Sequence, residues 1–404
     1  MKTSIRTSHN SMSQLRVLHL ITNLNVGGAQ SMLVKLLRRM ESRSVTSGVV
    51  SLQDLGPMSA AINQLRLPTE SLDMRSLRSL PSTVCRMGRI ISDWQPDVVQ
   101  TWMYHSNWVG ALSAKLSRQP TPVVWNIRMN PPLPGVDKRS THWVAGHCGK
   151  HMRRLAHQCV LNSKVSARGH VELGYPADRL TVIPNGFDTD TIDASPTLRN
   201  QWRDQWQVGD GELIIGTVGR FHPHKDYRTF VGAAKRIHDE LSSVRFVMCG
   251  EGLSADNDEL IGWIREANLE DRFILLGRQT DVAGVYSAVD LAVSSSILEG
   301  FPNSVGEAMA CRVPCAVTNA GGTAELVGNT ARIVSCRRPD HLAEECVRVL
   351  RFSKEHRRDL GENGRARIIQ HFGLDQIAQQ YETLWQQVAG TLMPPTSGRK
   401  QKAA

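Results

Sequence analysis

The sequence predicts an α/β protein built from two Rossmann-like, doubly wound domains. Short apolar runs alternate with amphipathic helical segments along most of the chain, a pattern typical of parallel sheets covered by helices. The length of 404 residues is long for one domain and suits two. In each half, an apolar run leads through a glycine-containing loop into a helix, which is how doubly wound folds build phosphate sites.

The first half contains six expected strands. They cover residues 16–21, 48–52, 98–101, 123–127, 158–161 and 180–183. Helices are expected at residues 29–40, 82–93 and 106–116. A loop with the paired glycines Gly27 and Gly28 joins the first strand to the first helix, although paired glycines alone often serve only to turn the chain. The proline- and glycine-rich stretch 130–150 is expected to be a mobile loop.

The second half repeats the alternation. Its strands are expected at residues 213–218, 244–249, 273–276, 291–293 and 314–318. Its helices are expected at residues 227–241, 282–288, 339–352, 354–370 and 375–388. The strand 213–218 leads into a loop that carries Arg220 and Lys225. Two cations between a strand and a helix suit a diphosphate, and the alternative is an ordinary pair of surface charges.

The organising stretch of the chain is 294–310, which follows an apolar strand. Pro302 is suited to open a helix, because its missing N–H costs nothing in the first turn. Glu299 and Glu307 stand eight residues apart on either side of this helix start. Carboxylates beside an anion-binding helix end are suited to accept hydrogen bonds from sugar or ribose hydroxyls. The alternative is that Glu299 caps the helix and Glu307 is merely solvated.

Composition narrows the possible partners. Residues 1–189 carry 23 Lys and Arg against 10 Asp and Glu, a net charge of +13, whereas residues 190–404 carry 25 against 28, a net charge of −3. A basic half predicts an anionic surface or substrate. Nucleic acid is not expected, because no nucleic-acid-binding signature accompanies the charge. No apolar run reaches membrane-spanning length, no secretory signal is expected, and the eight scattered cysteines indicate reduced core thiols.

Several motifs in this order resemble glycosyltransferase family 4, which comprises retaining enzymes with the two-domain GT-B fold. The resemblance covers roughly residues 15–390. It rests on Glu299 and Glu307 as a Glu-x7-Glu pair, Gly219-Arg220 with Lys225, the loop Gly27-Gly28-Ala29-Gln30, and the loop Ile183-Pro184-Asn185-Gly186-Phe187-Asp188. It implies two facing domains with the active site in an interdomain cleft. It also implies a nucleotide-diphosphate sugar as donor and a glycan or lipid-linked acceptor, of the bacterial cell-surface polysaccharide type.

The site residues follow from matching these motifs. Expected catalytic residues are Glu299 near the transferred sugar and Arg220 and Lys225 on the diphosphate. Expected donor-binding residues are Gly27, Gly28, Gly219, Arg220, Lys225, Gly300, Phe301, Pro302, Asn303 and, on the ribose, Glu307. His105 and Arg128 are assigned to the acceptor or sugar side. Arg128 stands where family members often carry a sugar-contacting His, and Gln30 stands where the family often has Glu.

No metal and no cofactor are expected. Asp188-Thr189-Asp190 spells the Asp-x-Asp pattern that binds a metal in another glycosyltransferase fold, but here it lies in a connecting loop. The predicted activity is metal-independent, hexosyltransferase-type transfer with retention of configuration. The alternatives are a GT-B nucleotide-sugar epimerase, which needs no acceptor, and a non-catalytic sugar-binding protein with this fold.

The expected organisation has six parts. These are a disordered N-terminus at 1–14, an acceptor-side Rossmann-like domain at 15–189, a linker at 190–211, a nucleotide-sugar-binding Rossmann-like domain at 212–374, a C-terminal helix at 375–390 that crosses back to the first domain, and a disordered tail at 391–404. A cytoplasmic protein, peripheral at the inner face of the membrane, is expected. The candidate for contact with an anionic membrane is the segment that carries Arg75, Arg78, Arg86 and Arg89, and the alternative is an ordinary solvated helix on the sheet.

Overall fold

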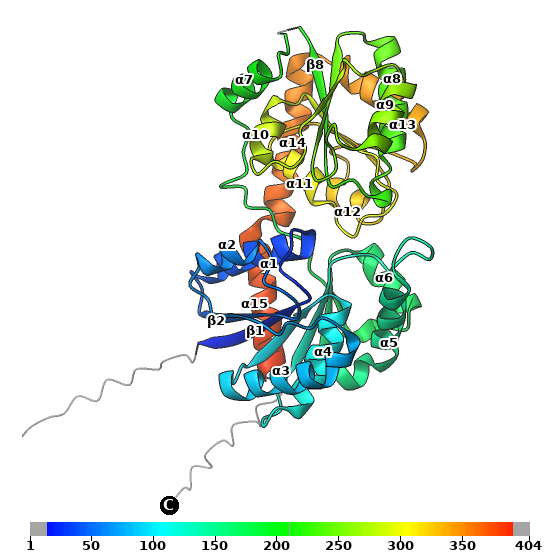
Figure 1. Ribbon diagram of the computed structural model, residues 1–404. Helices are drawn as coiled ribbons and strands as arrows, with labels where there is room; N and C mark the ends of the chain where they lie inside the picture. Colours follow the sequence, from blue (N-terminus) through cyan, green and yellow to red (C-terminus); the bar gives the residue numbers. More distant parts are fainter. Residues whose placement is uncertain (1–13, 210, 391–404) are drawn as a thin grey trace, which may run out of the picture. The chain divides into compact units, whose positions relative to one another are not determined.

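The computed structural model describes residues 14–209 and 211–390. The disordered ends expected at 1–14 and 391–404 lie outside the described residues, apart from Gln14. The described chain forms a seven-stranded and a six-stranded parallel sheet, each covered by helices (Figure 1). The predicted α/β class with two doubly wound domains is therefore confirmed. The exact domain boundaries given above stay predictions.

The first sheet has the strand order β3-β2-β1-β4-β5-β6-β7. Its strands are β1 (Leu15–Ile21), β2 (Val45–Ser51), β3 (Thr69–Ser71), β4 (Val98–Trp102), β5 (Val123–Ile127), β6 (Gln158–Leu161) and β7 (Leu180–Val182). The helices between them are α1 (Gly28–Met40), α2 (Ser59–Asn63), α3 (Leu80–Trp94), α4 (Tyr104–Leu116), α5 (Arg139–Leu155) and α6 (Lys164–Glu172), with short 3-10 turns η1 (Leu77–Ser79) and η2 (Ala177–Arg179). β4 and β5 are buried along their whole length, as expected for strands covered on both faces.

One expectation for this half is wrong. The stretch 130–150 is not a loop throughout, because α5 begins at Arg139. The prolines and Gly135 interrupt regular structure only before that point. Beyond it, Val144, Cys148 and Met152 recur at helical spacing and pack into the core. Because His, Lys and Arg residues stand between these apolar positions, the composition of the segment does not indicate a helix.

The second sheet has the strand order β10-β9-β8-β11-β12-β13. Its strands are β8 (Leu213–Val218), β9 (Val244–Cys249), β10 (Phe273–Leu275), β11 (Leu291–Ser294), β12 (Cys315–Thr318) and β13 (Arg332–Val334). Its helices are α7 (Pro196–Gln205), α8 (Tyr227–Glu240), α9 (Asp258–Glu266), α10 (Val282–Ala288), α11 (Asn303–Ala310), α12 (Thr323–Val327), α13 (Pro339–Leu350) and α14 (Lys354–Phe372), with the 3-10 turn η3 (Pro223–Lys225). One apolar cluster joins the sheet to α8, α9 and α13, and a second joins it to α10, α11 and α14.

Two segments tie distant parts of the sequence together. In α7, within the predicted linker, Arg199 and Arg203 both pair with Asp290, at 2.7 and 3.3 Å. The last helix, α15 (Leu374–Gly390), sends Trp385 into the core of the first sheet, where its indole Nε1 donates to Gln100 Oε1 on β4 at 2.7 Å. Residues 382–390 thus belong to the same compact unit as residues 14–102.

Acid is expected to destabilise the protein through two buried histidines. Burial lowers the pKa of His19 to about 3 and that of His170 to about 4. In the unfolded chain both titrate near their ordinary pKa of about 6.5. Between about pH 6.5 and 4 the unfolded state therefore binds more protons than the folded state. The free energy of unfolding should fall by up to about 1.4 kcal/mol for each histidine and each unit by which the pH is lowered.

Urea unfolding measured between pH 7 and pH 5 tests this expectation. The slope of stability against pH should be smaller in His19→Gln and in His170→Gln than in the unchanged protein. Equal slopes in all three proteins would contradict the assignment.

Candidate active site

The candidate site lies at the carboxyl edge of the second sheet. The strand order reverses between β8 and β11, and ligands of doubly wound folds bind where such a reversal leaves a crevice. The loop after β8 carries Arg220 and Lys225, and the loop after β11 carries Glu299. The two loops are 74 residues apart in sequence at Lys225 and Glu299, and the topology makes them neighbours.

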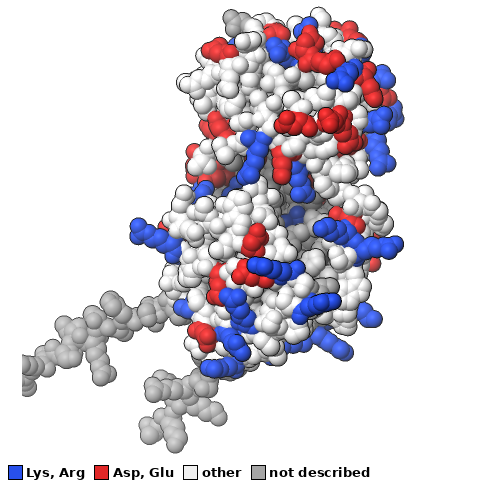
Figure 2. Space-filling view, in the orientation of Figure 1, with Lys and Arg blue, Asp and Glu red and all other residues white. Residues whose placement is uncertain are grey.

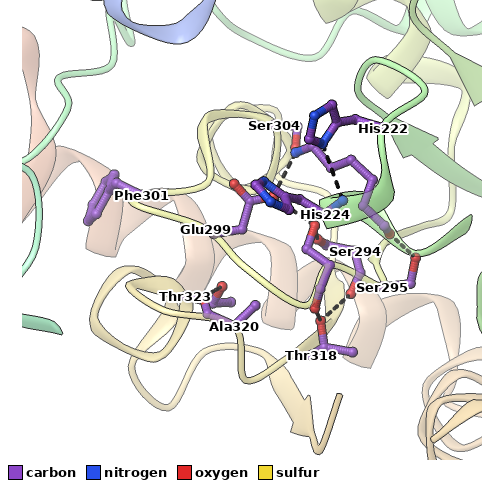
Figure 3. A network of polar contacts seen from close by, with 12 residues as sticks. His222, His224, Ser294, Ser295, Glu299, Phe301, Ser304, Thr318, Ala320 and Thr323 are labelled. Atoms are coloured by element: carbon purple, nitrogen blue, oxygen red, sulfur yellow. Dashed lines mark hydrogen bonds and ion pairs between the residues drawn. The ribbon is translucent and has the colours of Figure 1, made fainter. Parts of the chain in front are cut away.

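Lys225 and Glu299 form an ion pair at this edge. Lys225 Nζ lies 2.6 Å from Glu299 Oε1, and the Ser296 hydroxyl donates to the same oxygen at 2.7 Å. Figure 3 shows Glu299 together with Ser294, Ser295 and Thr318 from the neighbouring strand ends. The two charged side chains are 21% and 12% exposed. A pair screened this far from water interacts more strongly than a surface pair, yet both groups still reach solvent. The sequence motifs had assigned these residues to different parts of one ligand, and the structure brings them into contact.

Backbone and hydroxyl contacts fix the two loops against each other. The Ser295 hydroxyl donates to the carbonyl of Lys225 at 2.8 Å, and the amide of Ile297 donates to the carbonyl of His224 at 2.8 Å. The Thr318 hydroxyl, at the end of β12, donates to the carbonyl of Ser296 at 2.5 Å. The Lys225–Glu299 pair is therefore held by three successive strand ends, with little freedom to rearrange its backbone.

Glycine allows the turn after β12 to approach the Glu299 loop. Gly321 has a φ of +55°, and a Cβ added there would lie 1.8 Å from the carbonyl oxygen of Glu299. The amide of Gly322 donates to that same carbonyl at 3.1 Å. On the other side of the site, a Cβ at Gly219 would lie 2.8 Å from the Tyr227 hydroxyl and 3.2 Å from Lys225 Cε. Both glycines thus occupy places where a side chain would displace a predicted ligand-binding group.

The first turn of α11 follows directly on the Glu299 loop. Pro302 is the N-cap residue, with extended backbone, and no side chain caps the helix. Glu299 consequently does not act as the cap, which removes the simpler role considered for it. An uncapped helix N-terminus offers N–H groups and the positive end of the helix dipole to an anion.

Arg220 and Glu307 are the other two charged residues of the predicted donor site. Arg220 is exposed, and within residues 14–209 and 211–390 its guanidinium has no recorded hydrogen bond or ion pair, so its charge is open to a ligand. Glu307 is half-buried on α11. Burial, and after it the charge of Glu307, raises the pKa of Tyr286, whose hydroxyl donates to the carbonyl of Ser304 at 2.7 Å.

Other residues of the donor motif lie in the same segment. Gly300 is half-buried, Phe301 and Pro302 are buried, and Asn303 is the first residue of α11. Phe301 is 5% exposed and packs in the apolar core of the second sheet. Phe301 therefore acts on a ligand at most through its backbone and through the position of the loop.

The remaining predicted site residues lie on the first sheet. Gly27 is the N-cap of α1 and Gly28 its first residue, at the carboxyl end of β1. His105 stands in the first turn of α4, just after β4. Burial, and after it the charge of Lys138, lowers the pKa of His105. Since the strand order reverses between β1 and β4, these residues flank the corresponding edge position of this sheet.

Arg128 is enclosed by protein partners. Its guanidinium donates to the Asn185 side chain, to the carbonyl of Ile183 at 2.8 Å and to the Tyr381 hydroxyl at 3.1 Å. Burial lowers its pKa, and no carboxylate is recorded among these contacts. The structure thus shows Arg128 as a link between β5, the segment after β7 and α15. Its contact with a sugar or acceptor stays a prediction.

Sequence reasoning missed the residues that support the ion pair. Ser295, Ser296 and Thr318 were not singled out, because single hydroxyls at strand ends are common and carry no motif. Tyr227 was also missed: it is 3% exposed, and its hydroxyl has no hydrogen-bond partner among the described residues. The only available signal was the run of three serines directly after a buried strand.

We expect Gly321→Ala to lower turnover at least about tenfold, because the methyl group must push the Glu299 carbonyl away and because φ is unfavourable there. Gly262→Ala on α9 is the matched control, since its added Cβ has open space and alanine favours a helix. Turnover and thermal unfolding of both variants test this. Unchanged turnover in Gly321→Ala would show that the Glu299 loop does not need this position.

Comparison with known proteins agrees with this fold and these motifs. The family described as glycosyltransferase family 4 matches residues 26–191, and the family described as glycosyl transferases group 1 matches residues 199–367. The Anabaena protein Alr3699/HepE, solved in complex with UDP and glucose, superposes with a TM-score of 0.81 over 92% of this chain and 100% of its own, at 23% identity. The chain therefore contains a glycosyltransferase family 4 domain followed by a glycosyl transferases group 1 domain, in the GT-B fold.

Two relatives illustrate the activities found around this chain. N-acetyl-alpha-D-glucosaminyl L-malate synthase of Bacillus anthracis is 27% identical over 46% of this chain and 49% of its own length. The UDP-Gal:alpha-D-GlcNAc-diphosphoundecaprenol alpha-1,3-galactosyltransferase of Escherichia coli is 27% identical over 64% of this chain and 65% of its own. The chain thus spans about half to two thirds of these relatives. Its two domains match glycosyltransferase family models, as the motifs predicted.

Proposed function

We propose that the protein transfers a sugar, with retention of configuration, from a nucleoside diphosphate sugar to a hydroxyl of a glycan or lipid-linked acceptor. The observation that carries this proposal is the Lys225–Glu299 pair at the reversal point of the second sheet, beside the exposed Arg220 and the uncapped N-terminus of α11. Two cations and free amides suit a diphosphate, and a carboxylate next to them suits the hydroxyls of the attached sugar.

The proposed chemistry is charge stabilisation. As the bond between sugar and diphosphate breaks, negative charge grows on the leaving phosphate oxygens. Lys225, Arg220 and the α11 amides would stabilise that charge in the transition state. When the donor binds, the ammonium group of Lys225 must then either break its ion pair with Glu299 or interact with Glu299 and the phosphate at once. Without a paired nucleophile and base among the assigned residues, the leaving phosphate would take the proton of the acceptor hydroxyl on the same face of the sugar.

A donor panel tests the proposal. The protein is incubated with UDP-, GDP- and dTDP-sugars, starting with UDP-glucose because the Anabaena structures contain UDP and UDP-glucose. Slow release of the nucleoside diphosphate with retained configuration of the freed sugar, followed by NMR, is the expected result. Conversion of one nucleotide sugar into its epimer would favour an epimerase. Binding without any turnover, even with acceptor glycans added, would favour a sugar-binding protein.

A further inference from the structure

Helix α5 carries an unusual outer face on the first sheet. Its 17 residues, Arg139–Leu155, contain four Lys or Arg, three His and no Asp or Glu. Its inner face, including Val144, Cys148 and Met152, packs in the core. On the outer face, Trp143, His147, Lys150 and Arg154 follow at helical spacing and form one stripe. The sequence alone had suggested a loop here.

Trp143 stands at one end of this stripe with 64% of its surface exposed. Its ring stacks on His147, with ring centroids 4.8 Å apart and planes 13° apart, and His147 in turn lies 4.5 Å from the ring of His151. Stacking holds the indole in a fixed position on the surface. A large exposed aromatic ring with a polar N–H is typical of residues that sit at the boundary between lipid and water.

The positive charges at the other end of the stripe lack acidic partners. Lys150 and Arg154 are exposed, and among residues 14–209 and 211–390 neither side chain has a recorded ion pair. Desolvation and the neighbouring His147, Lys150 and Arg154 lower the pKa of His151, as expected in a positive potential. A groove of about 450 Å³ runs beside them, lined by Gly149, Lys150, His151, Arg153, Arg154, Gly174 and Pro176. Arg153 pairs with Asp178 at 2.6 Å, which leaves the charges of Lys150 and Arg154 for a ligand. A groove of this kind suits a phosphate headgroup.

The segment proposed from sequence fits a membrane less well. On α3, Val84, Met87 and Ile91 are buried against the sheet, so no apolar side chains of this stripe remain for lipid. Arg86 is paired with Glu70 at 2.6 Å. Figure 2 shows Lys and Arg spread over the visible surface rather than gathered in one patch, so total charge alone does not select a docking face.

We propose that the outer face of α5 docks on an anionic lipid bilayer, with Trp143 in the interface and Lys150 and Arg154 against lipid phosphates. No helix within residues 14–209 and 211–390 has the length and apolarity to cross a bilayer, so this contact is peripheral. The charged groups contribute an electrostatic attraction to the bilayer that weakens as salt is added. The indole contributes an apolar part of the binding free energy, which salt does not screen. The inference does not depend on the transfer reaction, because binding is measured without a sugar donor.

Co-sedimentation with phosphatidylglycerol–phosphatidylcholine vesicles tests the docking face. Lys150→Gln with Arg154→Gln should weaken binding about 25-fold, at about fivefold for each positive charge lost. The matched control removes two equally exposed charges on the other segment, through Arg75→Gln with Arg89→Gln, and should change binding far less. Thermal unfolding confirms that both double variants are folded.

Quenching of tryptophan fluorescence by brominated lipid tests the indole separately. Trp143→Phe keeps an aromatic ring, so the protein should still sediment with anionic vesicles while the lipid-dependent quenching is largely lost. The proposal is overturned by absent sedimentation with anionic vesicles or by equal sedimentation with pure phosphatidylcholine. Equal losses in the two double variants, or undiminished quenching in Trp143→Phe, would overturn it as well.

Discussion

Lys225→Ala is expected to lower kcat/KM for donor turnover by roughly 30- to 1000-fold, which corresponds to ~2–4 kcal/mol of transition-state stabilisation. The lysine is held by an ion pair of 2.6 Å at the strand reversal, so it is placed before the donor arrives. Its removal takes away a diphosphate charge and leaves the Glu299 carboxylate, among residues 14–209 and 211–390, with the Ser296 hydroxyl as its side-chain donor. Arg220→Ala should act in the same direction.

The control for this experiment lies on the following helix. Lys235 lies on α8 with its side chain 43% exposed and pairs with Asp239 at i,i+4, a contact worth only a few tenths of a kcal/mol. Lys235→Ala removes the same charge from the same part of the chain without touching the loop. Steady-state kinetics at matched thermal stability decide the matter. Near-normal kcat/KM in both Lys225→Ala and Arg220→Ala would contradict the prediction that this loop binds the diphosphate.

Glu299→Gln should mainly lower kcat, by roughly 100-fold or more, whereas Glu307→Gln should mainly raise the donor KM. Contacts to the reacting sugar tighten as charge develops, while a ribose is bound alike in ground and transition states. Glutamine has nearly the same size as glutamate, so the loop that Ser295, Ser296 and Thr318 hold should keep its place.

Full kinetics for both glutamine variants, with one donor and saturating acceptor, separate the two effects. The opposite pattern would mean that Glu307 faces the sugar and Glu299 the ribose. The variant Ser296→Ala is a third test, since it removes a hydrogen bond to Glu299 but keeps the negative charge of Glu299. It should lower kcat less than Glu299→Gln does.

The strands could be predicted because their sequences carry the signal. The bounds expected for 123–127, 158–161, 213–218 and 244–249 match β5, β6, β8 and β9, since each is a mostly apolar run with at most one polar residue. The short edge strand β3 was missed because Thr69–Ser71 contains no apolar residue. Helix α5 was missed because histidine and basic residues separate its apolar positions.

The site could be predicted only one loop at a time. Arg220 and Lys225 were recognised by the glycine before them, and Glu299 and Glu307 by their spacing. That Lys225 contacts Glu299 depends on β8 and β11 being neighbours, which no local pattern contains. The contacts of Arg128 could not be predicted either, because its partners Asn185 and Tyr381 lie 57 and 253 residues further along the chain.

The position of Trp385 in the first sheet has a consequence for biosynthesis. Trp385 and its hydrogen-bond partner Gln100 are 285 residues apart in the sequence. The first half of the chain therefore leaves the ribosome long before its core can be completed. At ~5–20 residues per second, this interval lasts roughly 15–60 s. During it, His19 on β1 and Gln100 on β4 lack the cover that Trp385 later provides. The core of the first sheet is therefore completed only after nearly the whole chain has been synthesised.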